Sequence, residues 1–95
     1  MINMSTLPSE LEPFLCGGRI TKVPVKRAKR LMLLDYIAQA FEPGRKYRES
    51  EVNESLRAMH DDYAALRRYL VDEDFLSREA GIYWRSGGTV DVDRG

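Results

Sequence analysis

The side chains in this sequence that are best suited to chemistry are arginines, which can bind phosphates or the edges of bases. Arg67 and Arg68 stand next to Tyr69 in a segment with helical apolar spacing. A guanidinium can bind guanine through two parallel hydrogen bonds or hold a phosphate oxygen. With Leu66 and Leu70 facing the core, about 100° of rotation per residue points Arg68 away from the core and leaves Arg67 at its margin. Arg68 is therefore the leading candidate for a nucleic-acid contact, with Arg67 and Tyr69 beside it.

Other basic residues fall into three groups that could extend this contact. They are the cluster Lys26, Arg27, Lys29 and Arg30, the group Arg45, Lys46 and Arg48, and the pair Arg78 and Arg85. The first cluster lies where a helix should begin, and positive charge there opposes the helix dipole by roughly 0.3–1 kcal/mol per charge. Phosphate contact would explain that placement. A solvated face that serves only solubility is the alternative.

Two features favour a different role for part of this set. Arg67, at the margin of the core, could instead pair with Glu51 or another carboxylate of the preceding helix. Asp61 and Asp62 stand where the helix that carries Arg68 should begin. They suit N-capping, but they would repel a phosphate from that helix N-terminus. A protein-interaction or dimerisation module therefore remains the alternative to direct DNA contact.

Residues for catalysis or metal binding show no recognisable spacing. His60 is the only histidine and Cys16 the only cysteine, and no Ser/His/Asp set, phosphate-binding glycine loop or isolated carboxylate pair can be assembled. We therefore expect no enzyme, no cofactor and no metal. A lone cysteine, the absence of a signal-peptide pattern and the absence of an apolar run of roughly 18–20 residues predict a cytoplasmic protein with no membrane partner.

Charge is unevenly distributed along the chain, although the 95 residues are neutral overall. Residues 17–48 contain nine basic and two acidic side chains, a net charge of +7, whereas residues 49–95 have a net charge of −5. This division indicates either an anionic partner for one face or two halves that neutralise each other in the fold.

The elements that position these residues follow from apolar periodicity and turn residues. A chain of this length suffices for one domain with one core. We expect, in chain order, a short helix over 8–15, an extended arm over 19–25, a long amphipathic helix over 26–41, a bridge at 47–48, a helix opening at Glu49, a turn at 60–62, a helix over 63–71, and a hairpin of 75–78 with 82–85.

This order is typical of a mainly α domain with a small β-hairpin, the winged helix-turn-helix. We divide the chain into an amino-terminal helix and arm over 1–25, the winged helix-turn-helix domain over 26–86 and a disordered tail over 87–95.

The apolar core is predicted from the inward positions of these elements. It comprises Leu31, Leu34, Ile37, Phe41, Val52, Leu56, Leu66, Leu70, Phe75, Leu76 and Trp84. In the hairpin, residues 76–78 should pair antiparallel with 82–84, with Gly81 in the turn. Alternation then places Ile82 and Trp84 on one face and Tyr83 on the other.

Short motifs spread over residues 14–84 suggest a family. In order they are Gly18-Arg19-Ile20 with Pro24, Phe41-Glu42-Pro43-Gly44-Arg45-Lys46-Tyr47, Glu51-Val52-Asn53, His60-Asp61, Leu66-Arg67-Arg68-Tyr69-Leu70-Val71 and Gly81-Ile82-Tyr83-Trp84-Arg85. Together they resemble the bacterial family called domain of unknown function 2087, although that pattern would have a glycine where Asp74 stands. Its members occur alone or appended to transcription regulators, so the resemblance implies a nucleic-acid-linked, regulatory setting. We therefore predict a nucleic-acid-binding domain that takes part in bacterial transcription regulation through DNA contact.

Overall fold

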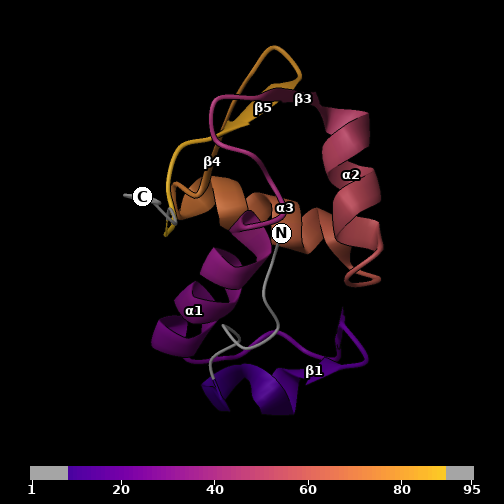
Figure 1. Cartoon of the computed structure of the whole chain (residues 1–95), viewed down its shortest axis with the longest axis vertical. Coiled ribbons are helices and arrows are strands. Elements are labelled where there is room, and N and C mark those ends of the chain that lie inside the picture. Colours follow the sequence, from indigo (N-terminus) through magenta and orange to yellow (C-terminus); the bar gives the residue numbers. More distant parts are fainter. Residues whose placement is uncertain (1–8, 90–95) are drawn as a thin grey trace, which may run out of the picture.

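The computed structural model describes residues 9–89, which form four helices and two small antiparallel sheets (Figure 1). In chain order the elements are the 3-10 helix η2 (Ser9–Phe14), β1 (Leu15–Cys16), β2 (Arg19–Ile20), α1 (Arg27–Ala38), β3 (Lys46–Arg48), α2 (Glu49–Arg57), α3 (Tyr63–Asp72), β4 (Leu76–Glu79) and β5 (Ile82–Arg85). The predicted order of the major elements is confirmed. The strand content exceeds the single small hairpin that we expected. Within the described range, no helix is long and apolar enough to cross a membrane.

Local sequence explains where the helices begin and end. The Asp62 carboxylate caps α3 by accepting a hydrogen bond of 3.3 Å from the Ala65 amide. At the start of α2, the Glu51 carboxylate accepts one of 2.8 Å from the Arg48 amide. Helix α1 ends at Ala38, three residues earlier than predicted, because the amides of residues 39–41 bond carbonyls three positions back and tighten the last turn.

The larger sheet has three strands in the order β3-β5-β4, all antiparallel. The predicted hairpin is confirmed, and the pairing extends one residue beyond the predicted 76–78 on β4 and 82–84 on β5. Ala80 and Gly81 form its two-residue turn, and both have positive φ angles, 53° and 81°. Such a turn matches the right-handed twist of the flanking strands.

The predicted short amino-terminal helix is present as the 3-10 helix η2, but the predicted arm begins as strand β2 of a hairpin. Pro13 lies inside η2, and Gly17 and Gly18, both with positive φ, turn the chain into the β1–β2 hairpin. This hairpin is fastened to the turn between α2 and α3. The Ile20 amide donates a hydrogen bond of 2.7 Å to the Met59 carbonyl, and His60 Nδ1 lies 3.0 Å from the Ile20 carbonyl oxygen. The arm is therefore an ordered part of the fold.

A single apolar core joins all the helices and the three-stranded sheet. Its buried residues are Leu11, Ile20, Leu33, Leu34, Ile37, Ala38, Phe41, Tyr47, Val52, Leu56, Leu66, Leu70, Leu76 and Tyr83. Most of the predicted core is confirmed, but Leu31 and Phe75 are only partly buried. Leu33 is also fully buried, and η2 packs against the helix α1 that carries it.

The prediction that Trp84 lies in the core is wrong. Tyr83 is fully buried, whereas Ile82 and Trp84 are half-buried on the opposite face. The register pairs Tyr83 with Tyr47 of β3, and residues directly opposite each other share a face of the sheet. Alternation correctly separated Tyr83 from its neighbours, but it could not tell which face the helices would cover.

The carboxy-terminal segment turns back from β5 onto α1. Thr89 donates hydrogen bonds from its amide and its hydroxyl to the Asp35 carboxylate, at 2.6 and 2.7 Å. Gly87 approaches the backbone of Asp74 so closely that an added Cβ would lie 2.4 Å from the Asp74 carbonyl oxygen. Residues 87–89 of the expected disordered tail thus make defined contacts, and residues 90–95 lie outside the described range.

Candidate nucleic-acid interface

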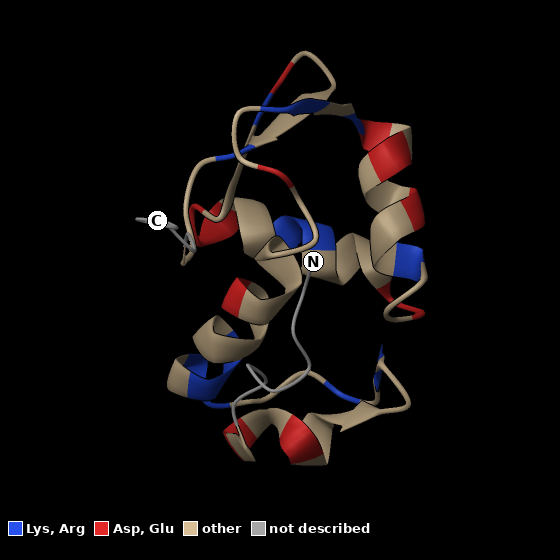
Figure 2. Ribbon diagram, in the orientation of Figure 1, with Lys and Arg blue, Asp and Glu red and all other residues tan. Residues whose placement is uncertain are grey.

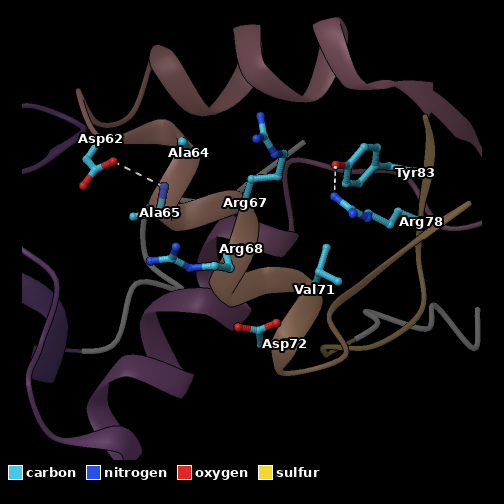
Figure 3. A pocket seen from close by; sticks show the side chains of 9 residues that line it. All are labelled: Asp62, Ala64, Ala65, Arg67, Arg68, Val71, Asp72, Arg78 and Tyr83. Carbon is cyan, nitrogen blue, oxygen red and sulfur yellow. Dashed lines mark hydrogen bonds between the residues drawn. The ribbon is translucent and has the colours of Figure 1, made fainter. Parts of the chain in front are cut away.

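A groove of about 510 Å³ lies between α3 and the β4–β5 hairpin (Figure 3). Its walls come from two elements that are distant in sequence. The lining residues are Asp62, Ala64, Ala65, Arg67, Arg68, Val71 and Asp72 from α3 and its cap, and Arg78 and Tyr83 from the hairpin. The groove thus brings together three of the arginines singled out from the sequence.

Arg68 lies on the outward face of α3. Leu66 and Leu70 are fully buried on the opposite side, so the helix phase used in the sequence analysis is correct. Arg68 is exposed, and within the described residues it forms no hydrogen bond or ion pair. Its guanidinium is therefore available to a ligand.

Arg67 has a partner on the neighbouring helix. It is half-buried, and its guanidinium donates a hydrogen bond to Asn53 Oδ1 of α2. The sequence correctly placed the alternative partner of Arg67 on the second helix, but the expected carboxylate, Glu51 or another, is wrong because the partner is the Asn53 amide. Arg67 therefore ties α3 to α2 at the edge of the groove.

Arg78 enters the groove from the hairpin and is held there by a polar chain. Arg78 Nη1 lies 3.4 Å from the Tyr83 hydroxyl oxygen, which in turn donates a hydrogen bond of 2.7 Å to the Glu49 carboxylate. The contact with Tyr83 raises the pKa of Arg78 further above its already high ordinary value. Arg78 is therefore a permanent cation whose position depends on a fully buried tyrosine.

Arg85 does not reach the groove. Its guanidinium donates hydrogen bonds to the carbonyl oxygens of Phe41 at 3.2 Å, Gly87 at 3.0 Å and Thr89. These bonds hold the carboxy-terminal segment against the end of α1. Arg85 therefore has a structural role, because its guanidinium is bonded to backbone carbonyls of the fold.

The basic cluster at the start of α1 lies apart from the basic part of α3 (Figure 2). Arg27 forms an ion pair with Glu73, with hydrogen bonds of 2.7 and 3.2 Å. The guanidinium carbon of Arg30 lies over the Tyr69 ring, 5.3 Å from the ring centroid. Arg30 also donates a hydrogen bond of 3.0 Å to the Val25 carbonyl oxygen.

The other members of that cluster are Lys26, which is exposed, and Lys29, which is half-buried. None of its four cations lines the groove, and neither does Tyr69. The predicted residues therefore do not all meet at one site.

The basic group around β3 is also separate. Arg45 stacks over the Tyr47 ring at 5.0 Å. Lys46 and Arg48 are exposed, and their register places them on the face of the sheet that carries Trp84, away from Tyr83.

Both ion pairs found among the described residues join the basic and acidic halves of the chain. Besides Arg27–Glu73, Arg19 pairs with Asp61 at 2.8 Å. Arg19 also donates to the carbonyl oxygens of Arg57 and Ala58 at the end of α2, at 3.3 and 3.0 Å. Part of the positive charge of residues 17–48 is therefore balanced within the fold by carboxylates of residues 49–95.

Three residues that shape this site were not selected from the sequence, namely Arg19, Asn53 and Tyr83. All three occur in the motifs quoted above, but their roles depend on contacts across 42, 14 and 34 positions, respectively. No group of three or more His, Cys, Asp or Glu side chains that could hold a metal occurs in the part of the chain that the structure describes.

Comparison with known proteins supplies a family. The model of the domain of unknown function 2087, described as an uncharacterized protein conserved in bacteria, matches residues 19–85. The match runs from the first residue of β2 to the last of β5 and so includes the whole groove. The resemblance noted in the sequence is thereby confirmed. No curated protein and no solved structure shows a significant match.

Proposed function

The chain belongs to the bacterial domain of unknown function 2087 family, and from that premise we propose that it is a winged helix-turn-helix domain that binds DNA and takes part in transcription regulation. The order of its elements supports this fold. Helices α2 and α3, joined by a short turn, correspond to the helix-turn-helix pair, and the β4–β5 hairpin corresponds to the wing. Helix α3 would then be the recognition helix.

The observation that carries the proposal is that three arginines line one groove. Arg67 and Arg68 come from α3 and Arg78 comes from the hairpin, so one anionic surface could contact both elements at once. The major groove of B-DNA, about 12 Å wide, admits an α-helix. A wing beside that helix then lies over the phosphate backbone.

The aspartates at the start of α3 oppose DNA binding less than the sequence suggests. Asp61 is paired with Arg19, and one oxygen of Asp62 accepts the Ala65 amide. Both carboxylates thus have a role in the fold, and part of their charge is balanced before any duplex approaches.

The first test measures affinity for a duplex of mixed sequence at about 50 and about 200 mM salt. Each phosphate contact adds about 0.9 to the slope of log K against log salt concentration. We expect Arg78→Gln to lower the affinity and to reduce this slope by about one unit. Lys22→Gln is the matched control, because it removes one positive charge from an exposed residue outside the groove. Its slope should equal that of the wild type.

The absence of any duplex binding at low salt would contradict the proposal, and so would a slope that Arg78→Gln leaves unchanged. In either case, a role as a protein-interaction or dimerisation module explains the groove better than DNA binding does. Asp62 and Asp72 favour it, because they place negative charge in the same groove as the arginines. Sedimentation of the purified chain, alone and over a range of concentrations, tests for a homodimer directly.

A further inference from the structure

The groove contains one arginine that is not engaged in the fold. Arg67 is bonded to Asn53, and Arg78 is held by Tyr83. Arg68 is exposed and has no such partner among the described residues, and Asp72, one turn further along α3, does not form an ion pair with it. Because Arg68 has no hydrogen bond within the described residues to break, its planar fork is open to the edge of a base.

The surroundings of Arg68 would allow α3 to come close to the floor of a DNA groove. The residues one turn earlier on the same face are Ala64 and Ala65, whose side chains are single methyl groups (Figure 3). Arg68 is therefore the long side chain that projects from the outward face of the first two turns. Residues in this part of a recognition helix are the ones that reach base edges.

We propose that Arg68 reads a guanine through its O6 and N7 atoms, and that Ala64 and Ala65 pack against the methyl group of a nearby thymine. This inference rests on the proposed DNA-binding function and specifies its substrate. Arginine is the most common partner of guanine in the major groove, and small apolar side chains contact the thymine methyl. The duplex recognised by α3 thus contains a guanine and a thymine in close succession.

The spacing along α3 fixes how close these two bases must be. Side chains three or four residues apart on a helix have Cβ atoms about 5–6 Å apart. Successive bases along a strand are separated by about 3.4 Å. The contacts from residues 64–65 and from Arg68 therefore fall on base pairs that are one or two steps apart.

The experiment selects bound duplexes from a randomised pool with the wild type and with Arg68→Lys. Lysine keeps the positive charge but lacks the planar fork that binds guanine through two bonds. We expect the wild type to enrich guanine with thymine one or two pairs away. Arg68→Lys should lose about 5- to 150-fold of the guanine preference, while its salt slope stays within about half a unit of the wild type.

Two further variants make the outcome specific. Arg57→Lys is the matched control, because Arg57 lies over the Tyr63 ring and does not line the groove; it should retain the guanine preference. Ala64→Ser should reduce the preference for thymine and should not change the preference for guanine. Circular dichroism of each variant verifies that it is folded.

The possible outcomes separate this inference from the function on which it rests. Salt-dependent binding without base preference, or a guanine preference that survives in Arg68→Lys, overturns the inference and leaves the proposed DNA binding intact. Failure of the wild type to bind any duplex at low salt overturns both.

Discussion

At the scale of single residues, two positions hold a side chain where the backbone favours glycine. Asp74 and Ala80 have φ angles of 64° and 53°, in the left-handed region. An L-residue in this region costs roughly 1–2 kcal/mol because its Cβ crowds the following carbonyl oxygen. Asp74 is also the position at which the family pattern led us to expect glycine. The turn into β4 therefore has the backbone conformation that glycine favours, with an aspartate at this position.

This strain predicts that Ala80→Gly stabilises the protein. The gain should be about 0.4–1 kcal/mol, because relief of the strain exceeds the extra entropy that glycine brings to the unfolded chain. Ala64→Gly is the comparison, since the same change within helix α3 should lower the free energy of unfolding by up to about 1 kcal/mol. Urea denaturation of both variants measures these differences. Equal destabilisation by both would contradict the conformation assigned to the hairpin turn.

At the scale of elements, α1 is tied to α3 by contacts near its amino terminus. Arg27 bonds Glu73, which follows the last residue of α3, and Arg30 covers the ring of Tyr69. These contacts explain why positive charge at the start of α1 is tolerated although it opposes the helix dipole. At least part of this basic cluster therefore serves the packing of two helices, whatever it also contacts.

The Arg27–Glu73 pair predicts a pH dependence of stability. Its hydrogen bond with Arg27 lowers the pKa of Glu73 below the usual glutamate range. The carboxylate of Glu73 therefore contributes stability at neutral pH, and this contribution is lost as the pH falls through the lowered pKa. The pKa of Arg27 is raised, so its own contribution persists up to strongly alkaline pH.

Glu73→Gln should therefore be less stable than the wild type at pH 7, and the difference should disappear in acid. Denaturant titrations at a series of pH values measure it. Glu54→Gln is the control, because Glu54 is exposed on α2 and no ion pair involves it among the described residues. A difference for Glu73→Gln that does not change with pH would refute the role of the ion pair.

At the scale of the whole molecule, one core includes the amino-terminal segment. Leu11 of η2 and Ile20 of β2 are buried with the helices and the sheet. The boundary that we drew after residue 25 therefore does not separate two cores. The family match, which begins at residue 19, also crosses it.

Leu11→Ala should consequently destabilise the protein as much as Leu66→Ala does. Both leucines are fully buried, and truncation of such a side chain costs about 2–5 kcal/mol. Val25→Ala, at a side chain that is 93% exposed, should change the stability by less than about 0.5 kcal/mol. Thermal and urea unfolding provide the measurements. If Leu11→Ala changes the free energy of unfolding as little as Val25→Ala does, helix η2 does not unfold cooperatively with the rest of the domain.

The sequence by itself determined the features that depend on neighbouring residues. The order of the major elements, the turn at Gly81 and the inward phase of Leu66 and Leu70 all follow from periodicity and turn chemistry within short segments. The orientation of Arg68 follows from the same phase. The motifs that identify the family are likewise legible in the sequence.

Only the tertiary structure decided what depends on distant partners. It placed Tyr83 in the core because the register with β3 selects the buried face of β5, which alternation alone cannot do. It also separated the arginines into those bonded within the fold, such as Arg67 and Arg85, and the free Arg68. A side chain's partners across tens of residues depend on how the elements pack together, and no local period encodes that packing.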